Sequence, residues 1–211
     1  MTRRDPERMQ RTILRAAAKE FARFGFAGAR VDRIAARAKA SKRMIYYYFN
    51  AKEGLFLAVL NGKLAERTHA DVAAHAGVME HLIATQRVTL RDLDYVRLLQ
   101  WEALEQPRHR DPDGTRQAAY DDLIDAVRQE QTRGRLPADT DPGHLALSLL
   151  GAALFPYVLP QLTEMLTGQR PASKTWLDQR DAHLRTLAAT LAQPEQVRWH
   201  SDDSGRAIPE G

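Results

Sequence analysis

Apolar residues recur along most of the chain at the three- and four-residue spacing of an α-helix. No segment alternates apolar and polar residues over the length of a strand, so the sequence predicts an all-α protein. The first helix is predicted to begin after Asp5, an N-cap residue followed by Pro6, and to end at Gly25, which tolerates left-handed backbone. Its apolar face is formed by Ile13, Leu14, Ala17, Phe21 and Phe24.

Three more helices are predicted close behind the first. Two short ones lie over about 31–38 and 41–48 and are separated by a three-residue turn. A tight break at 49–51 precedes a long fourth helix. We therefore place an N-terminal three-helix domain at residues 1–52, with residues 1–5 as an arm.

Residues 53–194 are predicted to form a second, helical bundle domain. Gly and Pro residues divide its later part into helices at about 78–90, 92–106, 111–134, 141–167 and 173–193. Pro156 and Pro160 should kink the helix at 141–167. The polar residues 195–211, which include Gly and Pro, are expected to form a flexible tail.

Charge is distributed unevenly along the 211 residues, although the formal net charge is only +4. Residues 1–63 carry 15 Lys/Arg against 5 Asp/Glu, a balance of +10. The remaining residues carry 16 Lys/Arg against 22 Asp/Glu, a balance of −6. A basic region on an acidic body indicates a polyanion, such as nucleic acid, bound at one end. An arginine-rich solvated helix surface is the alternative.

The composition favours a cytoplasmic protein. The chain has no cysteine, which excludes disulfides and thiol chemistry, and its first twenty residues are too charged for a secretory signal. Residues 142–163 carry no charge, but they are short for a membrane span and contain Pro156 and Pro160 in their interior. A helix buried in a bundle is favoured there, so no membrane association is predicted.

Neither an enzyme nor a metal or cofactor site is predicted. The sequence has no glycine-rich phosphate loop and no Gly-x-Ser-x-Gly motif. On one helix the six-residue spacing of His69, His75 and His81 would point them in different directions. Glu102 and Glu105 share a helix face, but no further ligand set accompanies them.

The second and third helices have the pattern of a helix-turn-helix. Small residues, Ala35 and Ala38, allow the second helix to pack closely against its partner. On the third helix, Ile45, Tyr48 and Phe49 lie about one turn apart and can face the core.

The opposite side of the third helix is polar and aromatic. Lys42, Arg43, Tyr46 and Tyr47 fall there, and Ser41 caps the helix N-terminus, whose free amides favour a phosphate. An ordinary helix pair with a solvated basic face would explain the charge. It would not explain successive tyrosines near the surface of a short helix, whereas a surface that contacts phosphates and bases would.

This segment strongly resembles the N-terminal domain of the TetR (tetracycline repressor) family. The matching residues are Ala16-Ala17, Phe21 to Phe26 (FARFGF), Val31 to Ala35 (VDRIA), Ala38 and Ser41 to Leu55 (SKRMIYYYFNAKEGL). The resemblance covers about residues 8–60. Beyond them only the all-helical layout is similar.

Two positions depart from the family pattern. Lys39-Ala40 stands in the turn where the family usually has Gly-Val, so Lys39 should strain the turn slightly. Ala29-Arg30 stands where a capping Thr is usual. Arg30 can replace that residue's phosphate contact but not its cap.

The resemblance implies double-stranded DNA as the partner and a role for each polar residue of the motif. Lys42 and Arg43 would reach base edges or nearby phosphates, with Arg43 suited to a guanine. Tyr46 would contact a thymine methyl group or a phosphate. The implied contacts to the DNA backbone are Arg30, Ser41, Tyr47 and Lys52. Arg3 and Arg4 would form an arm that either enters the minor groove or stays disordered.

The family resemblance also implies a homodimer on a two-fold operator, with the last two long helices of each subunit packed across the dimer. The residues predicted to supply this interface are Leu145, Leu149, Ala152, Trp176, Leu184, Leu187 and Leu191. The alternative is that these residues pack only within one subunit.

The central helices of the family usually enclose an effector pocket. The wall residues predicted here are Leu98, Trp101, Leu104, Leu123, Val127, Phe155 and Tyr157. They suit an apolar or aromatic small molecule, and plain core positions are the alternative. The sequence thus predicts a ligand-responsive dimeric repressor that releases a palindromic operator. A DNA-binding regulator without an effector is the second hypothesis, and a helical enzyme is a remote third.

Overall fold

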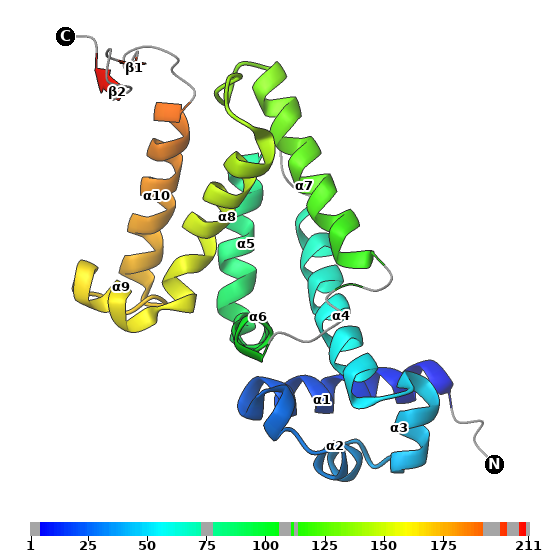
Figure 1. The fold of residues 1–211 in the computed structure, drawn as a ribbon. Coiled ribbons are helices and arrows are strands. Elements are labelled where there is room, and N and C mark those ends of the chain that lie inside the picture. Colours follow the sequence, from blue (N-terminus) through cyan, green and yellow to red (C-terminus); the bar gives the residue numbers. More distant parts are fainter. Residues whose placement is uncertain are drawn as a thin grey trace.

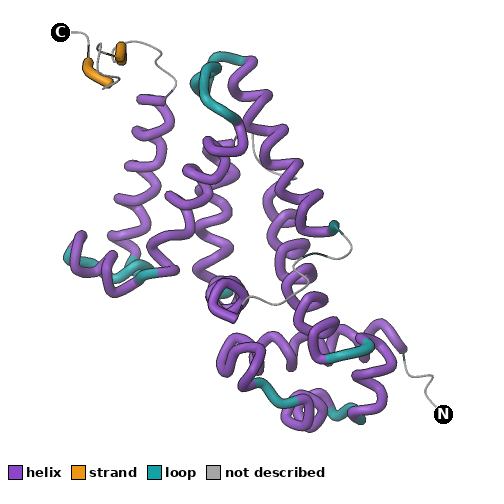
Figure 2. Tube along the Cα trace, viewed as in Figure 1, coloured by secondary structure: helices purple, strands orange, loops and turns teal. Residues whose placement is uncertain are grey.

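The computed structural model describes residues 5–72, 78–105, 111, 114–191, 199–201 and 207–209. They form ten helices and two short strands, which confirms the predicted all-helical fold class (Figures 1 and 2). The elements are α1 (Pro6–Gly28), α2 (Val31–Ala38), α3 (Lys42–Phe49), α4 (Lys52–Val72), α5 (Val78–Arg91), α6 (Leu93–Glu105), α7 (Thr115–Thr132), α8 (Pro142–Val158), α9 (Pro160–Thr167), α10 (Lys174–Leu191), β1 (Trp199–Ser201) and β2 (Ala207–Pro209).

The helices divide into two parts, which we name the head and the body. The head consists of α1, α2, α3 and the first half of α4, and lies at the bottom of Figure 1. The body consists of the rest of α4 and of α5 to α10. The helix α4 runs from one part into the other, and α6 lies across the junction between them (Figure 1).

The head is built around the apolar face of α1 that the sequence predicts. Ile13, Ala17 and Phe21 are fully buried there, packed against α2, α3 and α4. The rings of Phe21 and Phe56 meet edge to face at 5.1 Å, an arrangement that aromatic pairs prefer. The predicted N-cap of α1 is confirmed. The side chain of Asp5 accepts a hydrogen bond from the backbone N of Glu7 at 3.1 Å.

The segment predicted as one kinked helix at 141–167 is two helices, α8 and α9, which meet at 93°. The break lies at Leu159, whose φ of −126° and ψ of 69° are not helical. Proline disfavours helical backbone in the residue before it, so Pro160 explains why the chain bends there rather than at Pro156. Within the described residues, no single helix combines the length and hydropathy needed to cross a membrane, and α8 and α9 meet that test only as this bent pair.

The segment predicted to be a flexible tail, residues 195–211, contains a short strand pair that the sequence did not predict. The strands β1 and β2 are antiparallel, with His200 opposite Ile208. Each strand has only three residues, a length at which the alternation used to predict strands cannot be detected.

Gly25 interrupts α1 with φ 70° and ψ −179°, so its positive φ agrees with the prediction, although the helix resumes and ends at Gly28. The helix α6 approaches this point closely. A Cβ atom on Gly25 would lie 2.7 Å from Oε1 of Glu105 and 2.8 Å from the ring of Trp101. Only glycine therefore meets both the conformational and the steric requirement.

We predict that Gly25→Ala lowers the free energy of unfolding by about 2–4 kcal/mol, because it combines a strained φ with overlap against α6. Urea denaturation measures this loss. Gly62→Ala is the matched control, since a Cβ there meets nothing within 4 Å in the interior of α4. That variant should be neutral or slightly more stable. Equal effects of the two substitutions would contradict the proposed close approach.

Candidate nucleic-acid interface

The helix α3 is held in the head by its apolar side and capped at its start. Ile45 is 1% exposed, while Tyr48 and Phe49 are partly buried against the head core. This confirms the predicted rear face of the helix. Oγ of Ser41 accepts a hydrogen bond from the backbone N of Met44 at 3.1 Å, which confirms the N-cap.

The other side of α3 is exposed and carries the residues singled out in the sequence. Lys42 and Arg43 are exposed, and Tyr46 and Tyr47 are 44% and 79% exposed. Burial of aromatic rings normally stabilises a monomer, so two exposed tyrosines side by side indicate a surface used for binding. Lys42 forms an ion pair of 2.5 Å with Asp32, which links the start of α3 to α2.

The turn between α2 and α3 has the strain that the sequence predicts. Lys39 adopts left-handed backbone, with φ 51° and ψ 39°. Its backbone N donates to carbonyl oxygens near the end of α2, which closes that helix. At the other end of α2 no side chain caps the first turn, and Arg30 is exposed. Arg30 forms no ion pair with a described residue, and its contact with a phosphate stays a prediction.

Lys52 is placed differently from the other predicted contact residues. Its Nζ donates to the backbone oxygen of Ala27 at 3.2 Å and lies 4.9 Å from the centre of the Phe26 ring. Burial lowers the pKa of Lys52, and the charges of Glu105 and Glu20 oppose that shift. Lys52 therefore also ties the start of α4 to the end of α1.

Sequence reasoning missed Glu20, a carboxylate that organises the head from inside. Its side chain is buried, and Oε1 accepts hydrogen bonds from the backbone N of Arg30 at 3.1 Å and from Nε of Arg33 at 2.5 Å. Arg33 in turn donates to the backbone oxygen of Gly28 at 3.0 Å. Glu20 thus fixes the turn that leads into α2. A signal was present, because Glu20 lies on the apolar face of the first helix in a segment with few acidic residues.

Two hydrogen bonds that the sequence did not predict join α6 to α1 of the head. Nε1 of Trp101 donates to the backbone oxygen of Ala22 at 3.3 Å, and Oε2 of Glu105 accepts from the backbone N of Ala27 at 3.0 Å. Both contacts flank Gly25. The other carboxylate of the predicted pair, Glu102, forms two 2.8 Å hydrogen bonds with Arg116 of α7. Both carboxylates therefore have structural partners.

The residues predicted to line an effector pocket do not come together. Leu98 is buried in the head core, and Trp101 packs on α1. Leu104 and Phe155 are 75% and 45% exposed. Of the remaining wall residues, Leu123 and Val127 pack in one cluster of the body and Tyr157 in another. The prediction of one common wall is corrected on this point, since α6 turns Leu98 and Trp101 toward the head, while a different residue of α6, Val96, packs with Tyr157 in the body.

The predicted dimer residues are mostly covered within one subunit. Leu145 and Leu149 pack against α5 and α7, and Trp176 packs against Tyr157. Leu184 is buried, Leu187 and Ala152 are partly buried, and the side chain of Leu191 lies outside the described residues. At the buried positions the structure thus shows packing within one subunit, which was the alternative interpretation. The apolar residues exposed on α8, on α9 and at the bend between them are others, namely Leu147, Phe155, Leu159, Met165 and Leu166.

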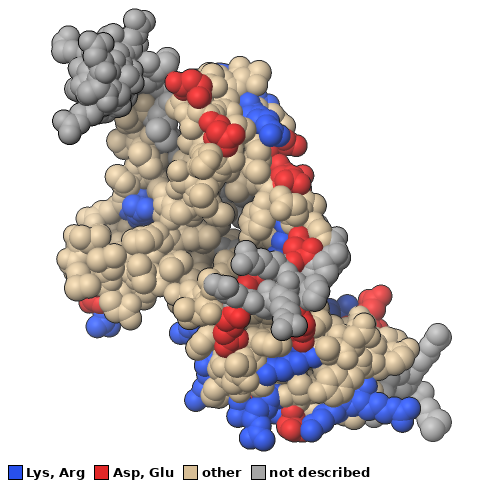
Figure 3. Space-filling model, viewed as in Figure 1, with Lys and Arg blue, Asp and Glu red and all other residues tan. Residues whose placement is uncertain are grey.

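Charged side chains separate along the molecule as the sequence predicts. Figure 3 shows Lys and Arg gathered over α1, α2 and α3, while acidic residues lie higher, on the body. The area over α8 to α10 carries few charges in the same view. No group of three metal-binding side chains occurs among the described residues, and the histidines at 69, 75 and 81 lie outside the side chains described.

Comparisons with known proteins agree with this geometry. A model of bacterial regulatory proteins of the tetR family matches residues 13–59, and a tetracyclin repressor-like C-terminal domain matches residues 78–193. The HTH-type transcriptional repressor SCO4008 from Streptomyces coelicolor is 37% identical over 172 residues, which are 80% of this chain and 88% of that protein.

Solved structures share the fold over most of the chain. The transcriptional regulator SCO4942 from Streptomyces coelicolor has a TM-score of 0.69 and 28% identity, covering 86% of this chain and 97% of its own. The regulator FadR from Bacillus subtilis, solved with stearoyl-CoA, has a TM-score of 0.65 at 18% identity, covering 85% and 97%. At 18% identity, the similarity to FadR shows only that the fold is shared.

A helix-turn-helix head on a helical body defines a DNA-binding transcriptional regulator rather than an enzyme. The chain belongs to the TetR family, with the family's N-terminal DNA-binding domain and its C-terminal domain both present. The resemblance found in residues 8–60 thus extends to the body.

We predict that Glu20→Ala lowers the free energy of unfolding by about 2–4 kcal/mol, since it leaves the backbone N of Arg30 and Nε of Arg33 without their acceptor. Urea denaturation gives the value. Glu7→Ala removes a carboxylate from an exposed i,i+4 pair on the same helix and should leave stability nearly unchanged. If both variants were equally stable, Glu20 would not organise the head.

Proposed function

We propose that the chain is a dimeric repressor that reads a two-fold operator with α3 in the major groove, and that a small molecule releases it. The observation that carries the operator contact is the exposed basic and aromatic side of α3, opposite the buried Ile45. A short helix with this polarity, in a strongly basic head, suits the groove and the phosphates on either side of it.

The proposed contacts divide into base reading and positioning. Arg43 is free of any ion pair among the described residues, so its guanidinium can pair with O6 and N7 of a guanine. Lys42 can reach base edges or phosphates once its ion pair with Asp32 is broken. Tyr46 would meet a thymine methyl group or a phosphate. The proposed contacts to the DNA backbone are Arg30, Ser41, Tyr47 and Lys52.

A dimer is supported by the apolar side of α8. Leu147, Gly151 and Phe155 follow each other at four-residue spacing and are exposed, and Leu159 continues this line to the bend. A stripe of this kind on a helix favours burial against another apolar surface. Figure 3 shows few charges in the same region. We propose that two copies of the chain meet through this stripe and α9, rather than through the residues that the sequence predicted.

Repression and response to a small molecule rest on relatives and on the interior of the body. SCO4008 is named as a repressor, and the FadR structure contains stearoyl-CoA. In this chain, the hydroxyl of Tyr157 and Oε1 of Gln86 are buried with no hydrogen-bond partner among the described residues. Burial also raises the pKa of Tyr157, which keeps its hydroxyl protonated and able to donate. A polar group of an effector that reached either atom would satisfy it.

The second hypothesis is a DNA-binding regulator that responds to no small molecule. It is favoured by the finding that the residues predicted to line an effector pocket are spread over separate clusters or exposed. Either regulator would act in the cytoplasm, where its operator lies.

We predict that Arg43→Ala weakens operator binding by about 1–3 kcal/mol and relaxes the preference at one base pair, because a base-reading fork is lost. Fluorescence anisotropy with operator and mutated operators measures both effects. Arg128→Ala removes a cation from the exposed surface of α7 and should leave affinity unchanged. Loss of affinity by the same factor on every DNA sequence would show that Arg43 contacts only phosphates.

We also predict that Phe155→Glu raises the dissociation constant of the dimer by at least about tenfold, because a charge would replace an apolar contact at the interface. Analytical ultracentrifugation of the purified protein measures this constant. Leu104→Glu is the control, since Leu104 is 75% exposed on α6 and lies outside the proposed interface. If the Phe155→Glu protein remained as dimeric as the control, the proposed interface would be wrong.

A further inference from the structure

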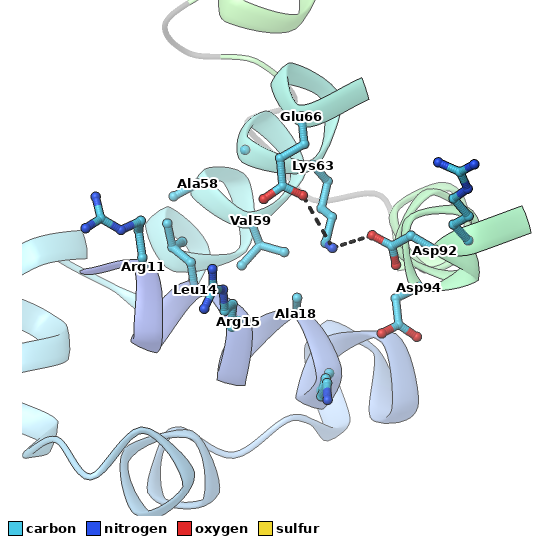
Figure 4. Close-up of a pocket in the computed structure, with 13 residues that line it drawn as sticks. Arg11, Leu14, Arg15, Ala18, Ala58, Val59, Lys63, Glu66, Asp92 and Asp94 are labelled. Carbon is cyan, nitrogen blue, oxygen red and sulfur yellow. Dashed lines mark hydrogen bonds and ion pairs between the residues drawn. The ribbon is translucent and has the colours of Figure 1, made fainter. Parts of the chain in front are cut away.

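A cleft of ≈ 430 Å³ lies between the head and the body, away from the proposed DNA surface. One of its sides is α1, another is α4, and the third is the corner where α5 ends and α6 begins (Figure 4). Its volume falls in the range of sites that hold small molecules. Because the cleft is lined from both parts of the molecule, a ligand in it would touch head and body together.

The carboxylates of the cleft already have cationic partners. Nζ of Lys63 lies between Asp92, to which it donates a hydrogen bond, and Glu66, whose Oε2 is 3.7 Å away (Figure 4). Asp94 is paired with Arg97, which is outside the cleft, at 3.6 Å. The acidic side chains of this site are therefore largely neutralised.

Three cations of the cleft are left without such partners. Arg15 and Lys19 of α1 and Arg91 at the end of α5 form no ion pair with any described carboxylate. Leu14 and Val59 supply an apolar part of the lining of the same cleft. Unpaired guanidinium and ammonium groups beside apolar carbon match a molecule that is anionic at one end and apolar at the other.

We propose that this cleft binds a small organic anion, a carboxylate or a phosphate monoester that carries a compact apolar group. The anionic group would be held by Arg15, Lys19 and Arg91, and the apolar group would lie on Leu14 and Val59. Such a ligand bridges α1 to the α5–α6 corner and restricts how the head sits on the body. Its effect on operator binding rests on the proposed function, but its binding does not.

Isothermal titration calorimetry of the DNA-free protein with phenyl phosphate tests the site. Binding should weaken at least about tenfold in the double variant Arg15→Gln/Lys19→Gln, which removes two charge-assisted contacts. Arg8→Gln removes an exposed cation of α1 that does not line the cleft and should bind phenyl phosphate like the unmodified protein. Thermal unfolding of each variant verifies that the fold is retained.

Inorganic phosphate and tetramethylammonium complete the binding test. Phosphate should bind more weakly than phenyl phosphate, because it makes no contact with the apolar lining, and the cation should not bind. No binding of phenyl phosphate, or the same affinity in the double variant and in Arg8→Gln, would overturn the site. Equal affinity for phosphate and phenyl phosphate would overturn the apolar part of the proposal.

A separate measurement tests the consequence for DNA. Saturating phenyl phosphate should change the operator affinity of the unmodified protein and leave that of the double variant unaltered. Phenyl phosphate binding without any change in operator affinity would overturn the coupling between cleft and head. Failure of the protein to bind any selected operator would instead overturn the proposed function and leave the calorimetric result intact.

Discussion

The contact of α6 with α1 at Gly25 is the constraint on which the arrangement of the protein depends. With no side chain at Gly25, the ring of Trp101 and the carboxylate of Glu105 can lie against the backbone of α1. Each then makes a hydrogen bond to that backbone, one on either side of the glycine. Lys52 bonds to the same stretch of α1 from α4. The head is thereby fixed to the body at the point where α1 breaks.

Residues in the interior of the head link the α1–α6 contact to the candidate DNA surface. Glu20, one turn before the break, holds the backbone of Arg30 and the side chain of Arg33, and so sets where α2 begins. The turn at Lys39 and the ion pair of Lys42 with Asp32 then orient α3 on α2. A displacement of α6 would therefore move the helix that we propose enters the groove. The interdomain cleft lies beside the same helix α1, so a ligand there would act on the same contact.

The sequence predicted the parts of the protein that depend on local pattern. The caps at Asp5 and Ser41, the strained Lys39 and the buried Ile45 follow from the chemistry of a few neighbouring residues, and the structure confirms them. The exposed side of α3 could be assigned because the spacing of Ile45, Tyr48 and Phe49 identified the opposite side as the one that faces the core. The roles of its residues toward DNA stay predictions.

The effector pocket and the dimer surface could not be predicted in the same way. Helical periodicity shows that a residue is apolar on one face, but not which distant element covers that face. Leu98 lies in the head because α6 packs on α1, and Leu145 and Leu149 face α5 and α7, which leaves Leu147 and Phe155 outside. Glu20 escaped notice for a related reason, since a buried carboxylate is explained only by donors that come from elsewhere in the chain.

Methylation interference on an operator selected from random DNA tests the central claim most directly, because N7 of guanine is exposed in the major groove. If α3 of each subunit enters that groove, methylated guanines at two symmetry-related positions should block binding. The positions should lie about one helical turn, or a multiple of it, apart. Binding that is indifferent to guanine N7 methylation, or blocked only by modification in the minor groove, would contradict the account.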